Sequence, residues 1–178
     1  MTKIISITSV SGGGKTTISN ALVAKLHNSC CIHFDEFEFP ISPADIDDWI
    51  NRGGDYCEWD ISPFSQNLNN LVKGNLYDYI VLDYPFARAH PALSSQIDYA
   101  FFLETPLDIA LSRRVLRDFQ KASSQEILDS ISEYLKDSRP SFIAMQIREK
   151  CFSDYIIDGE LSISTITRSI LNQVKSSK

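Results

Sequence analysis

A glycine-rich turn between an apolar run and an amphipathic run most constrains the fold of this chain. Residues 3–8 are short, apolar and β-branched, which predicts a buried strand. Residues 16–27 carry apolar side chains at helical spacing, and three consecutive glycines, residues 12–14, lie between the two runs. A strand that turns through glycines into a helix is typical of a domain in which helices connect parallel strands.

The rest of the chain repeats this alternation of strand and helix. Four further runs are short and almost wholly apolar, as expected of strands that are buried on both faces of a parallel sheet. These predicted strands span residues 30–34, 78–83, 98–103 and 155–158. The other predicted helices span residues 43–51, 63–73, 106–119, 124–136, 140–150 and 162–174. We therefore expect one three-layer α/β domain over residues 1–178.

The composition argues against several classes of protein. The chain holds 17 Lys and Arg against 23 Asp and Glu, a net charge of −6, which disfavours non-specific binding to nucleic acid or to an anionic membrane. No run approaches the ~18 apolar residues of a membrane-spanning helix, and no signal-peptide pattern is present. The four cysteines lack the spacing of a zinc site. We expect a reduced, cytoplasmic protein with neither a nucleic-acid nor a membrane partner.

The acidic side chains are concentrated in residues 35–60. This segment holds nine acidic residues and a single basic one, Arg52. A run of this kind is commonly a solvated surface, but it can also be a site where a metal or a proton is handled. The composition does not decide between the two interpretations.

The glycine turn matches a phosphate-binding motif. In the template Gly-x-x-x-x-Gly-Lys-Ser/Thr, the chain has Gly14, Lys15 and Thr16 at the end and Ser9 at the first glycine. Glycines allow backbone N–H groups to converge on phosphate oxygens, Lys15 can reach the outer phosphates, and Thr16 can offer a hydroxyl to Mg²⁺. We expect ATP and Mg²⁺ as cofactors. The residues predicted to bind nucleotide here are Ser11, Gly12, Gly13, Gly14, Lys15, Thr16 and Thr17.

Two acidic residues stand at the carboxyl ends of predicted strands. Asp83 ends the third strand, where it could hold Mg²⁺ or simply cap a turn. Asp35 follows the second strand and should emerge beside the phosphates, since ligands bind at that edge of a parallel sheet. There it could accept the proton of an attacking hydroxyl or contribute to the metal site. Glu36 is an alternative for both roles.

A predicted helix near residue 115 carries three arginines. Arg113 and Arg117 are four residues apart and share a face, whereas Arg114 lies beside them. Arginine suits the clamping of phosphoryl oxygens, because its planar guanidinium is bidentate and always charged. Residues 112–121 could therefore form a lid over ATP; the alternative is a solvated helix face that pairs with Asp108 or Asp118.

In the order and spacing of its motifs, the chain resembles members of the uridine kinase and phosphoribulokinase superfamily, which includes nicotinamide riboside kinases. The resemblance rests on residues 11–17, the acid-aromatic loop Asp35-Glu36-Phe37, residues 56–60, the arginine helix 112–118 and the late strand 153–158. It extends from residue 1 to about residue 170. Departures occur at residues 35–40, at residues 55–60, and at Asp83-Tyr84, where relatives often have glutamate and glycine.

The resemblance implies a five-stranded parallel sheet and a kinase that transfers the γ-phosphate of ATP to a hydroxyl of a nucleoside or ribosyl-like acceptor. By motif, Asp35 would be the catalytic base, Lys15 would hold phosphate, and Arg114 and Arg117 would belong to the lid, with Arg113 on the nucleotide. Residues 35–60 would form part of the acceptor site, and we name them the acceptor segment. The candidate acceptor-binding residues in it are Phe39, Tyr56, Trp59 and Asp60.

Two other functions remain open at this point. One is a nucleotide-dependent regulatory ATPase or switch, although no guanine-reading Asn/Thr-Lys-x-Asp motif is present. The other is an adenylate-kinase-like enzyme, whose phosphorylated acceptor would need basic residues where the acceptor segment offers only Arg52. The sequence therefore favours an uncharged or cationic acceptor.

Overall fold

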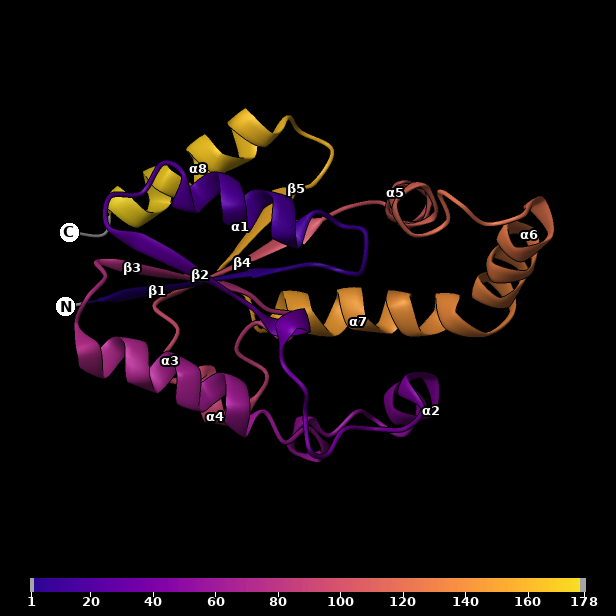
Figure 1. Ribbon diagram of the computed structural model, residues 1–178, viewed down its shortest axis with the longest axis horizontal. Coiled ribbons are helices and arrows are strands. Elements are labelled where there is room, and N and C mark those ends of the chain that lie inside the picture. Colours follow the sequence, from indigo (N-terminus) through magenta and orange to yellow (C-terminus); the bar gives the residue numbers. More distant parts are fainter. Residues whose placement is uncertain (1, 177–178) are drawn as a thin grey trace.

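The computed structural model describes residues 2–176, and its centre is a five-stranded sheet (Figure 1). All of its strand pairs are parallel, and the strand order is β2-β3-β1-β4-β5. The strands are β1 (Lys3–Thr8), β2 (Ser29–His33), β3 (Tyr79–Asp83), β4 (Tyr99–Glu104) and β5 (Tyr155–Asp158). The predicted parallel sheet between helices is confirmed, with each strand within a residue or two of its expected place.

Helices cover both faces of this sheet and thus complete the three layers. One face carries α1 (Lys15–Val23) and α8 (Ile163–Ser176), which pack against each other; the other carries α3 (Ser62–Gly74) and α4 (Pro91–Ser94) (Figure 1). Beyond the carboxyl ends of the strands, an arm is built from α5 (Leu107–Asp118), α6 (Ser124–Glu133) and α7 (Arg139–Cys151).

The acceptor segment lies outside the three layers and contains only short helices. They are the 3₁₀ turns η1 (Phe34–Glu36) and η2 (Tyr56–Glu58) and the helix α2 (Ile46–Asn51), which packs against α7. Phe34, which precedes the segment, is buried in the core, and the rings of Phe37 and Phe39 pack against it, whereas the acids between them are exposed. The alternation of rings and acids in the sequence therefore separates an inner from an outer side.

Alternating strand residues explain why both sheet faces are covered. Ile4, Ile80 and Leu82 belong to a buried cluster under α3 and the acceptor segment. Their neighbours along the strands, Ile5 and Val81, belong to a second cluster with α1 and α8. Because successive strand side chains point to opposite faces, continuously apolar strands require a helix layer on each side.

Several helix boundaries differ from those predicted, each for a local reason. Helix α2 begins at Ile46 instead of residue 43, because the Asp45 side chain accepts a hydrogen bond from the Asp48 backbone N–H and caps the helix there. A π-helical turn, η3 (Tyr134–Ser138), continues α6 into α7, so the predicted break before Pro140 is absent. Proline is accepted there because it stands in the first turn of α7. Helix α4 is too short to give a periodic signal.

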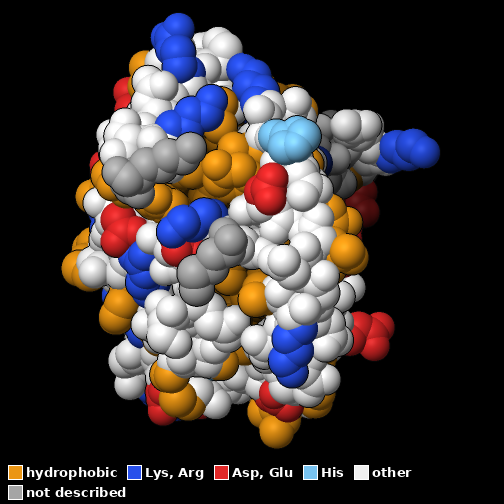
Figure 2. Space-filling model, turned by 90° about the vertical axis from the view of Figure 1, so that its left-hand side faces the viewer, with side chains coloured by type: hydrophobic (Ala, Val, Ile, Leu, Met, Phe, Trp, Pro, Cys, Tyr) orange, Lys and Arg blue, Asp and Glu red, His pale blue; other side chains and the backbone are white. Residues whose placement is uncertain are grey.

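The surface carries both signs of charge. On the face shown in Figure 2, basic and acidic side chains are interspersed among apolar and neutral ones. Within residues 2–176, no helix is both long enough and apolar enough to cross a membrane.

Candidate active site at the glycine-rich loop

The loop between β1 and α1 adopts a conformation that depends on glycine. Gly12 has φ +81°, and a Cβ atom at this position would lie 2.2 Å from the backbone oxygen of Ala110. Gly14 has φ +105° and caps the start of α1. L-residues rarely adopt these angles, so the glycines permit both the turn and the close approach of α5. The loop leads directly into the amino end of α1, and the amino end of a helix attracts anions through its free N–H groups and its dipole.

Two hydroxyl groups hold this loop against the end of β4. The Ser9 hydroxyl, which is buried, donates to the backbone oxygen of Leu103 at 2.8 Å. The Thr105 hydroxyl donates to the backbone oxygen of Gly13, also at 2.8 Å. Ser9, the residue that replaces the first glycine of the motif, thus anchors the loop through a hydrogen bond that glycine could not make.

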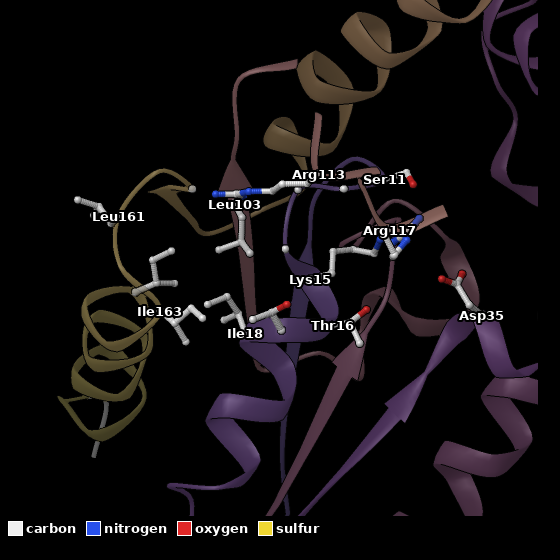
Figure 3. Close-up of a pocket in the computed structure, with 16 residues that line it drawn as sticks. Ser11, Lys15, Thr16, Ile18, Asp35, Leu103, Arg113, Arg117, Leu161 and Ile163 are labelled. Atoms are coloured by element: carbon white, nitrogen blue, oxygen red, sulfur yellow. The ribbon is translucent and has the colours of Figure 1, made fainter. Parts of the chain in front are cut away.

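A cavity of about 590 Å³ opens over this loop, within the usual size range of small-molecule sites. Its polar end is formed by the glycine loop, Lys15, Arg117 and Asp35, and its other end is apolar (Figure 3). The predicted nucleotide-binding residues all line it: Ser11, Gly12, Gly13, Gly14, Lys15, Thr16, Thr17 and Arg113. The structure therefore brings the whole predicted set together at one place.

The apolar end of the cavity was not predicted from the sequence. It is formed by apolar side chains from four places in the chain: Leu103 near the end of β4, Ile18 of α1, Leu161 between β5 and α8, and Ile163 at the start of α8 (Figure 3). Both Leu161 and Ile163 are about half exposed, so their side chains are open to a ligand in the cavity. Their position suits a flat heterocycle attached to a phosphate chain that lies on the glycine loop.

The candidate metal site lies where β3 meets α1. The Thr16 hydroxyl donates to Oδ2 of Asp83 at 2.6 Å, and Nδ1 of His33 is 3.0 Å from the same oxygen. The other oxygen, Asp83 Oδ1, is buried without a hydrogen-bond partner among the described residues. Hard oxygen donors beside a phosphate site fit Mg²⁺, which is commonly bound by one or two protein oxygens together with substrate phosphates. We found no cluster of three or more acidic, His or Cys side chains in residues 2–176 that could hold a metal ion without phosphates.

Asp35 stands at the opposite edge of the cavity from the apolar end. It belongs to the exposed turn η1, directly after β2, and its carboxylate reaches the cavity from the acceptor segment (Figure 3). The nearby guanidinium of Arg117 has a raised pKa, first because of its hydrogen bonds to Asp118 and in part because of Asp35. Asp35 therefore lies close to the cationic groups that could face a phosphate. Glu36 is exposed and does not line the cavity.

The three arginines of α5 divide between two directions. Arg113 and Arg117, which are four residues apart, both line the cavity. Arg114 points instead to the arm, where its guanidinium lies 5.3 Å from the ring centre of Tyr134 and 5.1 Å from that of Phe142. The structure therefore does not bring Arg114 to the cavity. Instead, Arg114 attaches α5 to the rest of the arm through cation–π contacts.

The predicted acceptor-binding residues do not line the cavity, and only Phe39 and Trp59 pack on Phe34, the residue that precedes Asp35. Phe39 stacks on Phe34 with 4.4 Å between ring centres, and Trp59 contacts both rings. Tyr56 is buried and donates a hydrogen bond to the carboxylate of Glu149. The carboxylate of Asp60 accepts from the backbone N–H and side chain of Ser62 at the start of α3, which lowers its pKa.

Comparison with known proteins agrees with this architecture. No protein-family model matches the chain. A curated uridine kinase from Streptococcus agalactiae is 26% identical, and the alignment covers 97% of this chain and 97% of that protein. A uridine kinase from Ligilactobacillus salivarius is also 26% identical, over 79% of this chain and 78% of the relative.

Solved structures of kinases share the fold. A shikimate kinase from Acinetobacter baumannii superposes with a TM-score of 0.53 at 17% identity, over 100% of this chain and 96% of that one. A deoxyadenosine kinase from M. mycoides gives a TM-score of 0.50 at 15% identity, over 97% and 99% of the two chains. The resemblance predicted from the motifs is thereby confirmed: the chain is a homologue of uridine kinases at modest identity, with the fold of the P-loop kinases.

Proposed function

We propose that this protein is an ATP-dependent small-molecule kinase that transfers the γ-phosphate of ATP to a hydroxyl group of a nucleoside or ribosyl-like acceptor. One observation carries the proposal. A single cavity joins an apolar end, a phosphate-binding loop with Lys15 and Arg117, and one carboxylate, that of Asp35, at the edge facing the acceptor segment. A kinase needs these parts in this order along the path of the phosphoryl group.

Each part has a distinct role in the proposed transfer. Asp35 accepts the proton of the acceptor hydroxyl, so that the oxygen can attack the γ-phosphorus. Lys15, Arg113 and Arg117 oppose the negative charge that spreads over the phosphoryl oxygens in the transition state. Thr16 and Asp83 would hold Mg²⁺, which supplies charge neutralisation of the phosphates when bound. Arg114 attaches α5 to the rest of the arm.

The basic groups near the acceptor segment favour an acceptor without a phosphate group. Arg52 is hydrogen-bonded to Asp48 and Glu58 on the surface. Arg148 lies over the rings of Trp49 and Tyr56 and donates to the backbone of the segment. Both guanidinium groups already have partners in or beside the acceptor segment and neither lines the cavity, which counts against an adenylate-kinase-like enzyme. The kinase names of the relatives support phosphoryl transfer rather than a nucleotide switch.

Trp59 is the strongest candidate for a contact with the acceptor. Its ring is half-buried against Phe34, the residue before Asp35, and its indole N–H has no hydrogen-bond partner among the described residues. A buried donor without a partner is costly, and a polar group of a ligand would satisfy it. Phe39, which packs on Trp59 and Phe34, would shape the same wall.

A coupled assay of ATP consumption tests the proposal. The purified chain is incubated with ATP, Mg²⁺ and single members of a panel of nucleosides, nucleoside monophosphates, sugars and hydroxylated vitamins, and the products are identified by mass spectrometry. We expect one unphosphorylated hydroxyl compound to be converted to its monophosphate. Phosphorylation of a nucleoside monophosphate in preference to every nucleoside, or ATP hydrolysis without transfer to any acceptor, would contradict the proposal.

A further inference from the structure

His33 and Asp83 are brought together by strand pairing. In the parallel ladder between β2 and β3, His33 is the register partner of Asp83, and both are the last residues of their strands. Register partners on neighbouring strands present their side chains on the same face. The imidazole therefore stands beside the carboxylate, with Nδ1 3.0 Å from Oδ2.

The chemistry of the partners fixes the direction of this hydrogen bond. An ionised carboxylate can only accept, so Nδ1 of His33 carries the hydrogen and donates it to Asp83. The other group near Nδ1 is the Cys31 sulfur, at 4.0 Å. A sulfur is a weak hydrogen-bond partner at that distance, so the carboxylate at 3.0 Å is the partner that Nδ1 engages.

Two donors thus meet on one carboxylate oxygen. Asp83 Oδ2 accepts from the His33 imidazole and, at 2.6 Å, from the Thr16 hydroxyl. The bond from Thr16 points its proton at the carboxylate, so the lone pairs of that hydroxyl remain for a cation. The second bond, from His33, fixes the rotation of the carboxylate, and Oδ1 is the oxygen left without a described partner.

We propose that His33 is a positioning residue that orients Asp83 and Thr16 for the magnesium ion of the bound nucleotide. The inference rests on the proposed binding of a Mg²⁺–nucleotide at the glycine loop. Hydrogen-bond partners of metal-binding groups set the orientation of those groups, and their loss commonly costs 10- to 100-fold in metal affinity or activity. His33 is itself only about one-fifth exposed at the edge of the sheet, so a test must keep its packing while it removes the hydrogen bond.

The test compares two substitutions of nearly the same shape. In His33→Asn the side-chain amide can still donate to Asp83 from the position of Nδ1, whereas in His33→Leu no donor remains. A fluorescent, non-hydrolysable ATP analogue is bound to each variant in EDTA and then across a Mg²⁺ titration, and bound Mn²⁺ is measured by electron paramagnetic resonance. The matched control is His27→Leu, since His27 is exposed in the turn before β2 and does not line the cavity.

For His33→Leu we expect an increase of about 10-fold or more in the Mg²⁺ concentration that half-saturates analogue binding, with binding in EDTA unchanged. His33→Asn should stay within about threefold of the parent chain, and His27→Leu should match it. Equal Mg²⁺ dependence in the Leu and Asn variants would overturn the proposal. Loss of analogue binding in EDTA would also overturn it, because His33 would then act on the fold. These binding measurements contain no acceptor, so they do not depend on the proposed kinase activity. The product assay described above tests that activity separately.

Discussion

The glycine loop, residues 9–17, and the acceptor segment, residues 35–60, meet at Asp35 but are held in place by different interactions. The loop is fixed by backbone geometry and by short hydrogen bonds, such as those of Ser9 and Thr105 to the backbone. The acceptor segment has little regular structure, and it is held by packed aromatic rings and by its contacts with α7. The loop takes its shape from its own glycines and is anchored by two distant hydrogen bonds, whereas the acceptor segment depends on distant packing for its shape as well.

Because the two regions are held differently, ATP binding and acceptor binding should respond to different substitutions. A phosphate-binding loop must place several N–H groups at fixed positions, and glycine angles achieve that within nine residues. Aromatic packing is less restrictive, because rings of similar size can be exchanged with moderate loss. We infer that substitutions in the loop affect ATP and turnover together, whereas substitutions in the acceptor segment affect the acceptor or the stability. The following predictions test this separation, from the largest effect to the smallest.

The largest effect is expected for Lys15→Ala. The ammonium group lines the polar end of the cavity, so its removal withdraws positive charge from the outer phosphates in both the bound and the transition state. Turnover should fall by about 10²- to 10³-fold, and ATP affinity should fall as well. Steady-state kinetics and calorimetric titration with an ATP analogue measure the two effects. Lys25→Ala, at an exposed lysine beyond the end of α1, is the control and should change neither.

The second-largest effect is expected for Asp35, which belongs to the acceptor segment but lines the cavity. Asp35→Asn keeps the shape of the side chain but removes the base, so turnover should fall by ~10²-fold or more while ATP affinity stays within about twofold. Glu36→Gln is the matched control, because Glu36 neighbours Asp35 but does not line the cavity. A larger loss of turnover in the Glu36 variant than in the Asp35 variant would transfer the role of base to Glu36.

The sequence predicted the loop side of the site almost completely because its signals are local. Strand, glycines, Lys15 and Thr16 are consecutive, and Arg113 and Arg117 are joined by a helical spacing that can be counted. Arg114 illustrates the limit of this reasoning. It has the same chemistry one residue away, but the Tyr134 and Phe142 rings of the arm, which no local pattern reveals, determine where it points.

Features that depend on long-range pairing were not predicted. The contact between His33 and Asp83 requires the register of β2 on β3, and an alternation pattern does not give that register. Leu161 and Ile163 reach the cavity only because β5 lies next to β4 at the sheet edge. The contact of Tyr56 with Glu149 joins residues 93 positions apart, across the surface between the acceptor segment and α7.

A third prediction tests whether the acceptor segment contacts the acceptor. Trp59→Phe keeps a ring in the cluster but removes the indole N–H that has no described partner, so the KM for the acceptor should rise by about 10-fold while the KM for ATP is unchanged. The matched control is Trp49→Phe. The Trp49 indole donates to the Asp55 backbone oxygen at 2.9 Å, so its loss should lower the free energy of unfolding by about 1 kcal/mol without changing either KM. An unchanged acceptor KM in the Trp59 variant would remove Trp59 from the acceptor site.

The smallest effect concerns how the acceptor segment is attached to α7. Glu149 of α7 accepts a hydrogen bond from Tyr56, and burial, the largest cause, raises the pKa of its carboxyl from 4.5 to about 7. Between these two values the unfolded chain releases a proton that the folded chain keeps, so the free energy of unfolding should fall as the pH rises through this window. One proton gives a slope of at most about 1.4 kcal/mol per pH unit.

Glu149→Gln should remove this slope, because glutamine can still accept from Tyr56 but does not ionise. Urea unfolding between pH 5 and 8 measures the slope directly, and Glu133→Gln, at an exposed position on α6, is the control with the same change of charge. We expect the Glu149 variant to gain stability over the parent chain at pH 8 by about 1 kcal/mol or more, with ATP affinity unchanged. If the parent chain and the Glu149 variant show the same pH dependence, Glu149 is not protonated in the folded state. In that case the attachment of the acceptor segment to α7 depends on its packed rings and on Arg148, whose guanidinium lies over Trp49 and Tyr56.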